Sequence, residues 1–141
     1  DAESVILCDT MGELRKFYSL AEVVFVGRSL VPMGGSDMIE AAALGKPTAF
    51  GPHTFNFPQA DDLAAHGCVR VTDSSDLAGV LAGWLADPQA AAQAGERAQQ
   101  FVISQQGATQ RNVEMICRML DRAPALAAGT IATDRIHAAA D

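Results

Sequence analysis

One short stretch of the sequence combines flexible backbone with acidic side chains. A segment with helical spacing begins after the run Gly34-Gly35-Ser36-Asp37, and Glu40 falls in its first turn. Because glycine has no Cβ, backbone N–H groups can converge at such a turn, and a helix N-terminus there suits a phosphate or a carboxylate. The Glu40 carboxylate could accept hydrogen bonds from two hydroxyls of a ribose. The stretch is therefore a candidate site for an anionic nucleotide ligand.

The same residue types also have a structural interpretation. Asp37-x-x-Glu40 and Thr10-x-x-Glu13 both have capping-box spacing, in which the glutamate only accepts a hydrogen bond from the cap's own N–H. Two adjacent glycines are also common in ordinary turns. Spacing alone therefore leaves both interpretations open.

The histidines and the absence of several known motifs limit the kinds of catalytic or metal site that we expect. His53 follows Gly51-Pro52 in a predicted loop, where a lone histidine is most often exposed or locally bonded, and His66 and His137 look incidental. The sequence contains no HxxxH or HExxH motif and no carboxylate cluster, so we expect no metal site. It also contains no GxSxG or GxxxxGK[ST] element, which disfavours hydrolases and ATPases.

Short apolar runs alternate with helical patterns through the first two-thirds of the chain. The runs that predict strands are 5–7, 23–26, 48–50 and 69–71, and the intervening helical patterns are 12–20, 38–44 and 59–65. This alternation predicts a Rossmann-like α/β fold with a parallel sheet covered on both faces. Ligands bind outside the carboxyl ends of such strands, so we expect residues 8–13, 27–40 and 51–57 to lie at the ligand edge.

The rest of the chain is predicted to be helical. Leu77, Val80, Leu81, Trp84 and Leu85 form an amphipathic stripe. Asp87-Pro88 is a good N-cap and N1 pair for a further helix, which Gly107 interrupts before another apolar stripe at 113–120. We therefore assign 1–122 to a partial Rossmann-like domain with a helical carboxyl-terminal segment. Residues 123–141 are expected to form a weakly ordered extension.

Composition excludes several classes of protein. Hydrophobic residues make up 49% of the chain and charged residues 19%, which is typical of a globular protein. A net charge of −7 argues against a nucleic-acid partner, and no run approaches the roughly 20 apolar residues of a transmembrane segment. The three cysteines are far apart, so we expect buried, unpaired thiols in a cytoplasmic protein. The first residues carry no secretory signal and suggest a cut within a longer protein.

Three separated motifs resemble one known family. They are Asp9-Thr10-Met11-Gly12-Glu13-Leu14, Phe25-Val26-Gly27-Arg28-Ser29-Leu30-Val31-Pro32 and Gly51-Pro52-His53-Thr54-Phe55-Asn56-Phe57. The sequence resembles the carboxyl-terminal domain of the 3-deoxy-D-manno-octulosonic acid (Kdo) transferases, which place Kdo on a lipid A precursor in lipopolysaccharide biosynthesis. The resemblance extends in register from about Val5 to about Arg122 and includes a Gly-Ala-Thr-x-Arg element at 107–111.

The resemblance implies a GT-B glycosyltransferase, with two Rossmann-like domains and the active site between them. In that family CMP-Kdo is the donor and binds mainly to the carboxyl-terminal domain. The reaction is inverting and needs no metal or other cofactor. The general base and most contacts with the lipid A precursor belong to the other domain, so this chain would hold no catalytic residue and would be inactive alone. The parent enzyme would work at the cytoplasmic face of the inner membrane.

The family's binding residues carry over to specific positions of this chain. Glu40 would hold the ribose, and the Gly34-Gly35-Ser36 turn, followed by Asp37, would lie near the phosphate. Met11-Gly12-Glu13 would line the cytidine or Kdo pocket. The neighbouring wall of the cleft would come from residues 51–56, among them Gly51, Pro52, His53 and Asn56.

The sequence departs from the family at the anion-binding end. The family usually reads Gly-Gly-His-Asn-Pro-Leu-Glu-Pro where this chain reads Gly34-Gly35-Ser36-Asp37-Met38-Ile39-Glu40-Ala41. Ser36 thus replaces an imidazole, and Asp37 replaces a neutral amide. Two like charges about 4 Å apart repel by roughly 4 kcal/mol at an effective dielectric constant near 20. Arg28, where the family prefers glycine, could return a positive charge or point into solvent.

Other functions remain open from the sequence. One is a non-catalytic binding or assembly module of GT-B descent that has lost the site. Another is a GT-B epimerase or transferase that uses a UDP-sugar, because a helix-borne glutamate on ribose is common in that fold. A response-regulator-like domain is disfavoured, because the acidic cluster that would bind Mg²⁺ is not apparent.

Overall fold

The computed structural model describes residues 4–122, which fall into two units, residues 4–105 and residues 106–122. The elements of the first unit are α1 (Leu14–Leu20), β1 (Val24–Val26), α2 (Ile39–Ala43), β2 (Thr48–Phe50), α3 (Ala60–Ala65), β3 (Val69–Arg70), α4 (Ser74–Ala86) and α5 (Pro88–Ser104). The second unit is formed by α6 (Ala108–Arg122). The extension predicted for 123–141 lies outside the described residues, so the boundary near residue 122 stays a prediction.

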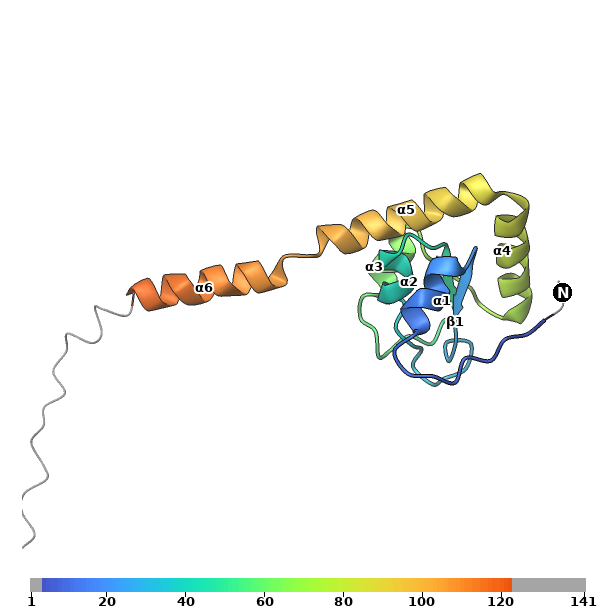
Figure 1. The fold of residues 1–141 in the computed structure, drawn as a ribbon, viewed down its shortest axis with the longest axis horizontal. Helices are drawn as coiled ribbons and strands as arrows, with labels where there is room; N and C mark the ends of the chain where they lie inside the picture. Colours follow the sequence, from blue (N-terminus) through green and yellow to red (C-terminus); the bar gives the residue numbers. More distant parts are fainter. Residues whose placement is uncertain (1–3, 123–141) are drawn as a thin grey trace, which may run out of the picture. The chain divides into compact units, whose positions relative to one another are not determined.

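The strands form a parallel sheet in the order β1-β2-β3. Val26 pairs with Phe50, and Phe50 pairs with Arg70, so the carboxyl ends of all three strands meet at one edge. This arrangement confirms the predicted α/β class and three of the four predicted strands. Figure 1 shows α5 crossing one end of the first unit and α4 standing along its side.

Both faces of the sheet are covered. Adjacent side chains of a strand point to opposite faces, and Phe50 and Ala49 accordingly belong to two different core clusters. The first cluster brings together Val24, Val26, Met38, Ala41, Ala42, Phe50, Ala60, Leu63, Cys68 and Ala98. The second brings together Ala49, Val71, Trp84, Ala91 and Ala94. Helix α5 contributes to both clusters, so it joins the two layers at one edge.

The first predicted strand is wrong. The Val5, Ile6 and Leu7 side chains are 95%, 80% and 86% exposed, and the segment has no regular secondary structure. A buried strand needs a hydrogen-bonded neighbour and covered faces, and no other described residue supplies either to residues 5–7. A short apolar run therefore predicts a strand only where a partner strand is available.

The expectation that all the cysteines are buried is also wrong. Cys68 is buried in the first core cluster, but Cys8 and Cys117 are exposed. Cys8 directly follows the exposed run 5–7, and Cys117 lies on α6, which the second unit leaves uncovered. Burial of these two thiols depended on packing that the described residues do not provide.

The predicted helix signals are confirmed by their hydrogen bonds. Asp87 caps α5 by accepting from Gln89 N at 3.1 Å and Ala90 N at 3.0 Å, and Pro88 occupies the first turn. Gly107 has a φ of +93°, and a break separates α5 from α6 there. Among the described residues, no helix is long and apolar enough to span a membrane.

Candidate ligand site at the carboxyl edge of the sheet

The loops that follow β1 and β2 are joined by one buried serine. Ser29 Oγ donates to the Val26 carbonyl at 2.5 Å and accepts from Gly51 N at 2.8 Å. The Ser29 carbonyl accepts from His53 N at 2.9 Å. Because Ser29 is fully buried, this network fixes the two loops against each other with little competition from water. The structure therefore confirms that segments 27–40 and 51–57 meet at the carboxyl edge of the sheet.

Close backbone approach explains why residue 51 is a glycine. A Cβ at this position would overlap the Ser29 carbonyl oxygen and lie 2.7 Å from Leu30 N. Because both are backbone atoms, a change of side-chain rotamer could not relieve the collision. Gly51 thus permits the contact between the loops and needs no ligand to account for it.

The predicted turn at Gly34 and Gly35 packs against the second loop, the one that follows β2. Both residues are buried and have positive φ angles, +86° and +80°. A Cβ on Gly34 would overlap Asn56 Nδ2 and lie 2.9 Å from Phe55 Cε2. Gly35 N donates to the Arg28 carbonyl at 3.0 Å. The structure therefore brings together the predicted site residues of both loops.

Arg28 has a backbone conformation that favours glycine. Its φ is +59°, the only positive φ of a non-glycine residue in the described part of the chain. The exposed guanidinium turns toward its own loop, with Nη2 3.5 Å from the Met33 carbonyl oxygen. Since a side chain in this region costs about 1 kcal/mol, the family's glycine has a steric rationale here.

The acidic residues of the turn do not form a capping box. Asp37 Oδ1 accepts from Ile39 N at 2.8 Å, but α2 has Met38 at its N-cap position and no side-chain cap bond. The exposed Glu40 carboxylate makes no hydrogen bond to any residue that the structure describes. The structural interpretation of Glu40 therefore fails, and its two oxygens stay open to a ligand.

Sequence reasoning missed a tyrosine beside these acids. Tyr18 on α1 is half-buried against the first core cluster, which includes Met38 at the start of α2. Burial raises the pKa of the Tyr18 phenol, and the negative charges of Glu40 and Asp37 raise it further. Tyr18 therefore lies within electrostatic range of the two acids of the turn. In the sequence, Tyr18 lies among alternating polar and apolar residues of a helical segment, and nothing in that pattern indicates that it lies near the acids of the turn.

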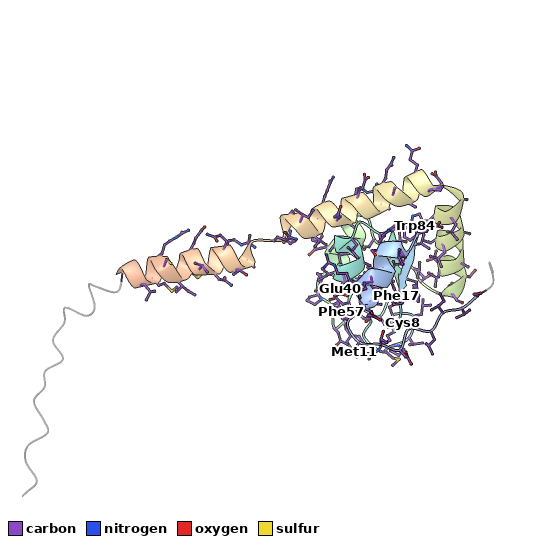
Figure 2. The ribbon with its side chains drawn as sticks, viewed as in Figure 1. Cys8, Met11, Phe17, Glu40, Phe57 and Trp84 are labelled. Atoms are coloured by element: carbon purple, nitrogen blue, oxygen red, sulfur yellow. The ribbon has the colours of Figure 1, made fainter. Side chains whose placement is uncertain are left out.

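Glu13, in the Met11-Gly12-Glu13 segment, is bonded to side chains that are close to it in sequence. Thr10 Oγ1 donates to Glu13 Oε2 at 2.7 Å, and Lys16 Nζ lies 3.2 Å from Glu13 Oε1. The Thr10 hydrogen bond, followed by that from Lys16, lowers the pKa of the Glu13 carboxyl. This is not the capping box, because the carboxylate bonds side chains and α1 begins only at Leu14. Met11 is almost fully exposed in the outer stretch that Figures 1 and 2 show leading into α1.

A pocket of about 310 Å³ adjoins the second loop. Its lining comes from that loop, from α3 and from the end of β3: Pro52, His53, Thr54, Phe55, Phe57, Pro58, Ala60, Asp61 and Arg70. Two of the predicted site residues, Pro52 and His53, therefore face this hollow. Within residues 4–122 no group of three or more His, Cys, Asp or Glu side chains could hold a metal ion.

Known proteins resemble this chain in both sequence and structure. No protein-family model matches it. It is 37% identical over 114 residues to the 3-deoxy-D-manno-octulosonic acid transferase of Bordetella pertussis, covering 79% of this chain and 27% of that protein. The Haemophilus influenzae enzyme of the same name is 32% identical over 121 residues, covering 84% of this chain and 28% of that protein.

A solved structure agrees with these relatives. The C-terminal CMP-Kdo binding domain of WaaA from Acinetobacter baumannii matches with 35% identity and a TM-score of 0.62, over 69% of this chain and 51% of that one. The chain belongs to the Kdo transferase family. It spans little more than a quarter of the length of the curated Kdo transferases named above. Its Rossmann-like fold is that of a Kdo transferase carboxyl-terminal domain.

Proposed function

We propose that this chain is the donor-binding portion of a Kdo transferase and binds CMP-Kdo at the carboxyl edge of its sheet. The observation that carries the proposal is the joined pair of loops, together with the Glu40 carboxylate, which pairs with none of residues 4–122. The loops supply a fixed backbone, and fixed groups bind a ligand without the entropic cost of ordering them. Similarity to a CMP-Kdo binding domain supports this choice of ligand.

Each part of the donor has a proposed partner. Glu40 accepts hydrogen bonds from the ribose hydroxyls, and the Gly34-Gly35-Ser36 turn faces the phosphate. Residues 51–56 form the wall beside the sugar, and Met11-Gly12-Glu13 approach the cytidine or the Kdo. The Thr10 and Lys16 contacts keep the Glu13 carboxylate ionised, so it would act there as a hydrogen-bond acceptor.

Asp37 weakens this site without removing it. One of its oxygens is bonded to Ile39 N, but the negative charge stays exposed at the end of α2 where the donor phosphate would lie. Repulsion between the two anions opposes binding. An asparagine could keep the bond to Ile39 N without the charge, so Asp37→Asn is expected to tighten donor binding by about tenfold.

Transfer itself requires groups beyond this chain. We propose that the general base and the contacts with the lipid A precursor come from another domain, and that the parent enzyme works at the cytoplasmic face of the inner membrane. The proposed reaction needs no metal, because the CMP leaving group would be stabilised by fixed backbone and side-chain donors. The isolated chain is then expected to bind the donor but not to transfer Kdo.

Calorimetric titration of the chain with CMP, CMP-Kdo and UDP tests the proposal. CMP and CMP-Kdo should bind, and Glu40→Ala should weaken binding by about 10- to 100-fold, because hydrogen bonds to a charged group are lost. Glu96→Ala on the exposed face of α5 is the matched control and should bind normally. Absence of binding at millimolar CMP and CMP-Kdo would overturn the proposal for this chain.

Two alternative functions predict different titrations. A non-catalytic module of GT-B descent, favoured by Ser36 and Asp37 at the anion end, would bind none of the three nucleotides even after Asp37→Asn. A GT-B enzyme that uses a UDP-sugar would bind UDP more tightly than CMP. The same experiment therefore separates all three candidates.

A further inference from the structure

The pocket beside the second loop contains an arginine that lies over an aromatic ring. Arg70, at the end of β3, places its Cζ 5.5 Å from the centroid of the buried Phe50 ring. Its Nη2 lies 2.6 Å from Asp61 Oδ1 on α3. The ring limits the positions of the guanidinium, whereas the exposed carboxylate adds only a weak, solvent-screened contact.

Most of the hydrogen-bonding capacity of Arg70 is still available. A guanidinium has five N–H donors, and among the described residues only the contact with Asp61 occupies any of them. The Asp61 side chain is 82% exposed, so solvent screens the pair and a second anion can share the guanidinium. Planar N–H donors suit a carboxylate or a phosphate.

The rest of the lining suits a ring with polar edges. Pro52, Phe55, Phe57 and Pro58 present apolar surface, while His53 and Asp61 offer hydrogen-bonding groups. Polar and apolar groups both line the pocket, with more polar than apolar surface, and its volume of about 310 Å³ lies at the lower end of the usual size of small-molecule sites. A sugar fits this combination, because its C–H faces are apolar and its hydroxyls both donate and accept.

The pocket adjoins the Gly34-Gly35 turn, which the proposed function places beside the donor phosphate. A Cβ placed on Gly35 would lie 3.3 Å from the His53 carbonyl oxygen and 3.6 Å from Phe57 Cδ2. His53 and Phe57 both line the pocket. A group attached to a phosphate at the Gly34-Gly35 turn can therefore reach the pocket.

We propose that this pocket binds a sugar ring that carries an oxyanion, with Arg70 opposite the oxyanion and with His53 at the ring hydroxyls. The proposal rests on the proposed function, since it places an acidic sugar next to the nucleotide site. The oxyanion could be the carboxylate of the donor sugar or a phosphate on an acceptor sugar. Arg70 is then a specificity-determining residue that distinguishes acidic from neutral sugars.

Nuclear magnetic resonance titrations of the ¹⁵N-labelled 141-residue chain test the assignment. The probes are free Kdo, its uncharged methyl ester, glucosamine 1-phosphate and CMP. Free Kdo should shift the Arg70 Nε–H signal and the amide signals of 52–61, and its methyl ester should bind at least about tenfold more weakly because the charged contact is lost. CMP should instead shift signals of 34–40. Binding of glucosamine 1-phosphate but not Kdo would support an oxyanion-bearing sugar and assign the pocket to the acceptor.

Three variants separate recognition from a structural role of the ion pair. Arg70→Gln should weaken Kdo binding at least about tenfold, whereas Arg97→Gln on α5 should not change it. Asp61→Asn should strengthen Kdo binding severalfold, because it removes the competing carboxylate and keeps Arg70. A purely structural pair would give no such gain. Thermal unfolding of each variant shows whether it remains folded.

Several outcomes would overturn the inference. One is equal affinity for Kdo and its methyl ester, and another is unchanged Kdo binding in a folded Arg70→Gln variant. If CMP shifts 34–40 but no sugar shifts 52–61, the pocket assignment fails and the proposed function stands. If neither CMP nor any sugar shifts a signal, both fail.

Discussion

Two segments each follow a short apolar run, but only one of them is held in place by the fold. Residues 27–38 follow β1 and are tied into the first unit by the buried Ser29 and by Gly35. Residues 8–13 follow the apolar run 5–7, but that run is exposed and forms no strand. In both places a short apolar run leads into a polar motif that resembles the same family.

The difference lies in the neighbours. β1 has β2 beside it, with Val24 opposite Thr48, and helices cover its faces. The run 5–7 has no strand beside it among the described residues. Apolar composition supplies the tendency to form a buried strand, but a partner backbone must complete the hydrogen bonds. A loop at the carboxyl edge of the sheet is positioned only where that partner exists.

The first test compares the thiols of the two regions. At pH 8 an alkylating reagent should modify the exposed Cys8 at least about a thousandfold faster than the buried Cys68, which reacts only when the unit opens. Mass spectrometry of labelled peptides over time measures both rates. Comparable rates in the native chain would mean that the first core cluster does not protect Cys68.

The pH dependence sharpens this comparison. Burial raises the pKa of the Cys68 thiol to about 12, while the same thiol in an unfolded chain ionises near 8.5. Native Cys68 should therefore stay protonated from pH 7 to 9, so its labelling should stay slow across that range. Since the unfolded chain releases the Cys68 proton at lower pH than the folded one, the Cys68 contribution to folding stability decreases from about pH 9 towards 12.

The second test breaks the anchored loops. Gly51→Ala should lower the free energy of unfolding by about 3 kcal/mol, because its Cβ would collide with the Ser29 backbone. Gly79→Ala in α4 is the matched control: a Cβ there meets nothing within 4 Å, so a gain of about 0.5–1 kcal/mol is expected. Urea unfolding of both variants measures the difference. A Gly51→Ala variant as stable as the parent would show that the loops can separate at little cost.

The fold was largely predictable because its signals are local. The apolar runs at 23–26, 48–50 and 69–71 became β1, β2 and β3, and Asp87 with Pro88 began α5 as expected. Ligand-edge loops follow from parallel topology, so the convergence of 27–40 and 51–57 was also predictable.

The details of the site depend on contacts between distant residues. Nothing in the sequence marks Ser29 as the group that joins two loops, since its partner Gly51 is 22 positions away. The spacing of Asp37 and Glu40 likewise fits both a capping box and a ligand-binding carboxylate. Only the hydrogen bonds of the turn show that Glu40 does not belong to a capping box. Arg70 and Asp61 meet only because β3 pairs beside β2. The sequence thus predicts which loops come together, but it does not predict which atoms of those loops form contacts.

The smallest expected effect tests the exposed run directly, with one substitution at two matched sites. Val26→Ala in β1 should cost about 2 kcal/mol, because it leaves a cavity in the first core cluster. Val5→Ala should change the free energy of unfolding by less than about 0.5 kcal/mol, because its side chain is 95% exposed. Urea unfolding measures both. If Val5→Ala cost as much as Val26→Ala, residues 5–7 would be buried in solution, and the neighbour that the strand prediction lacked would have to be present.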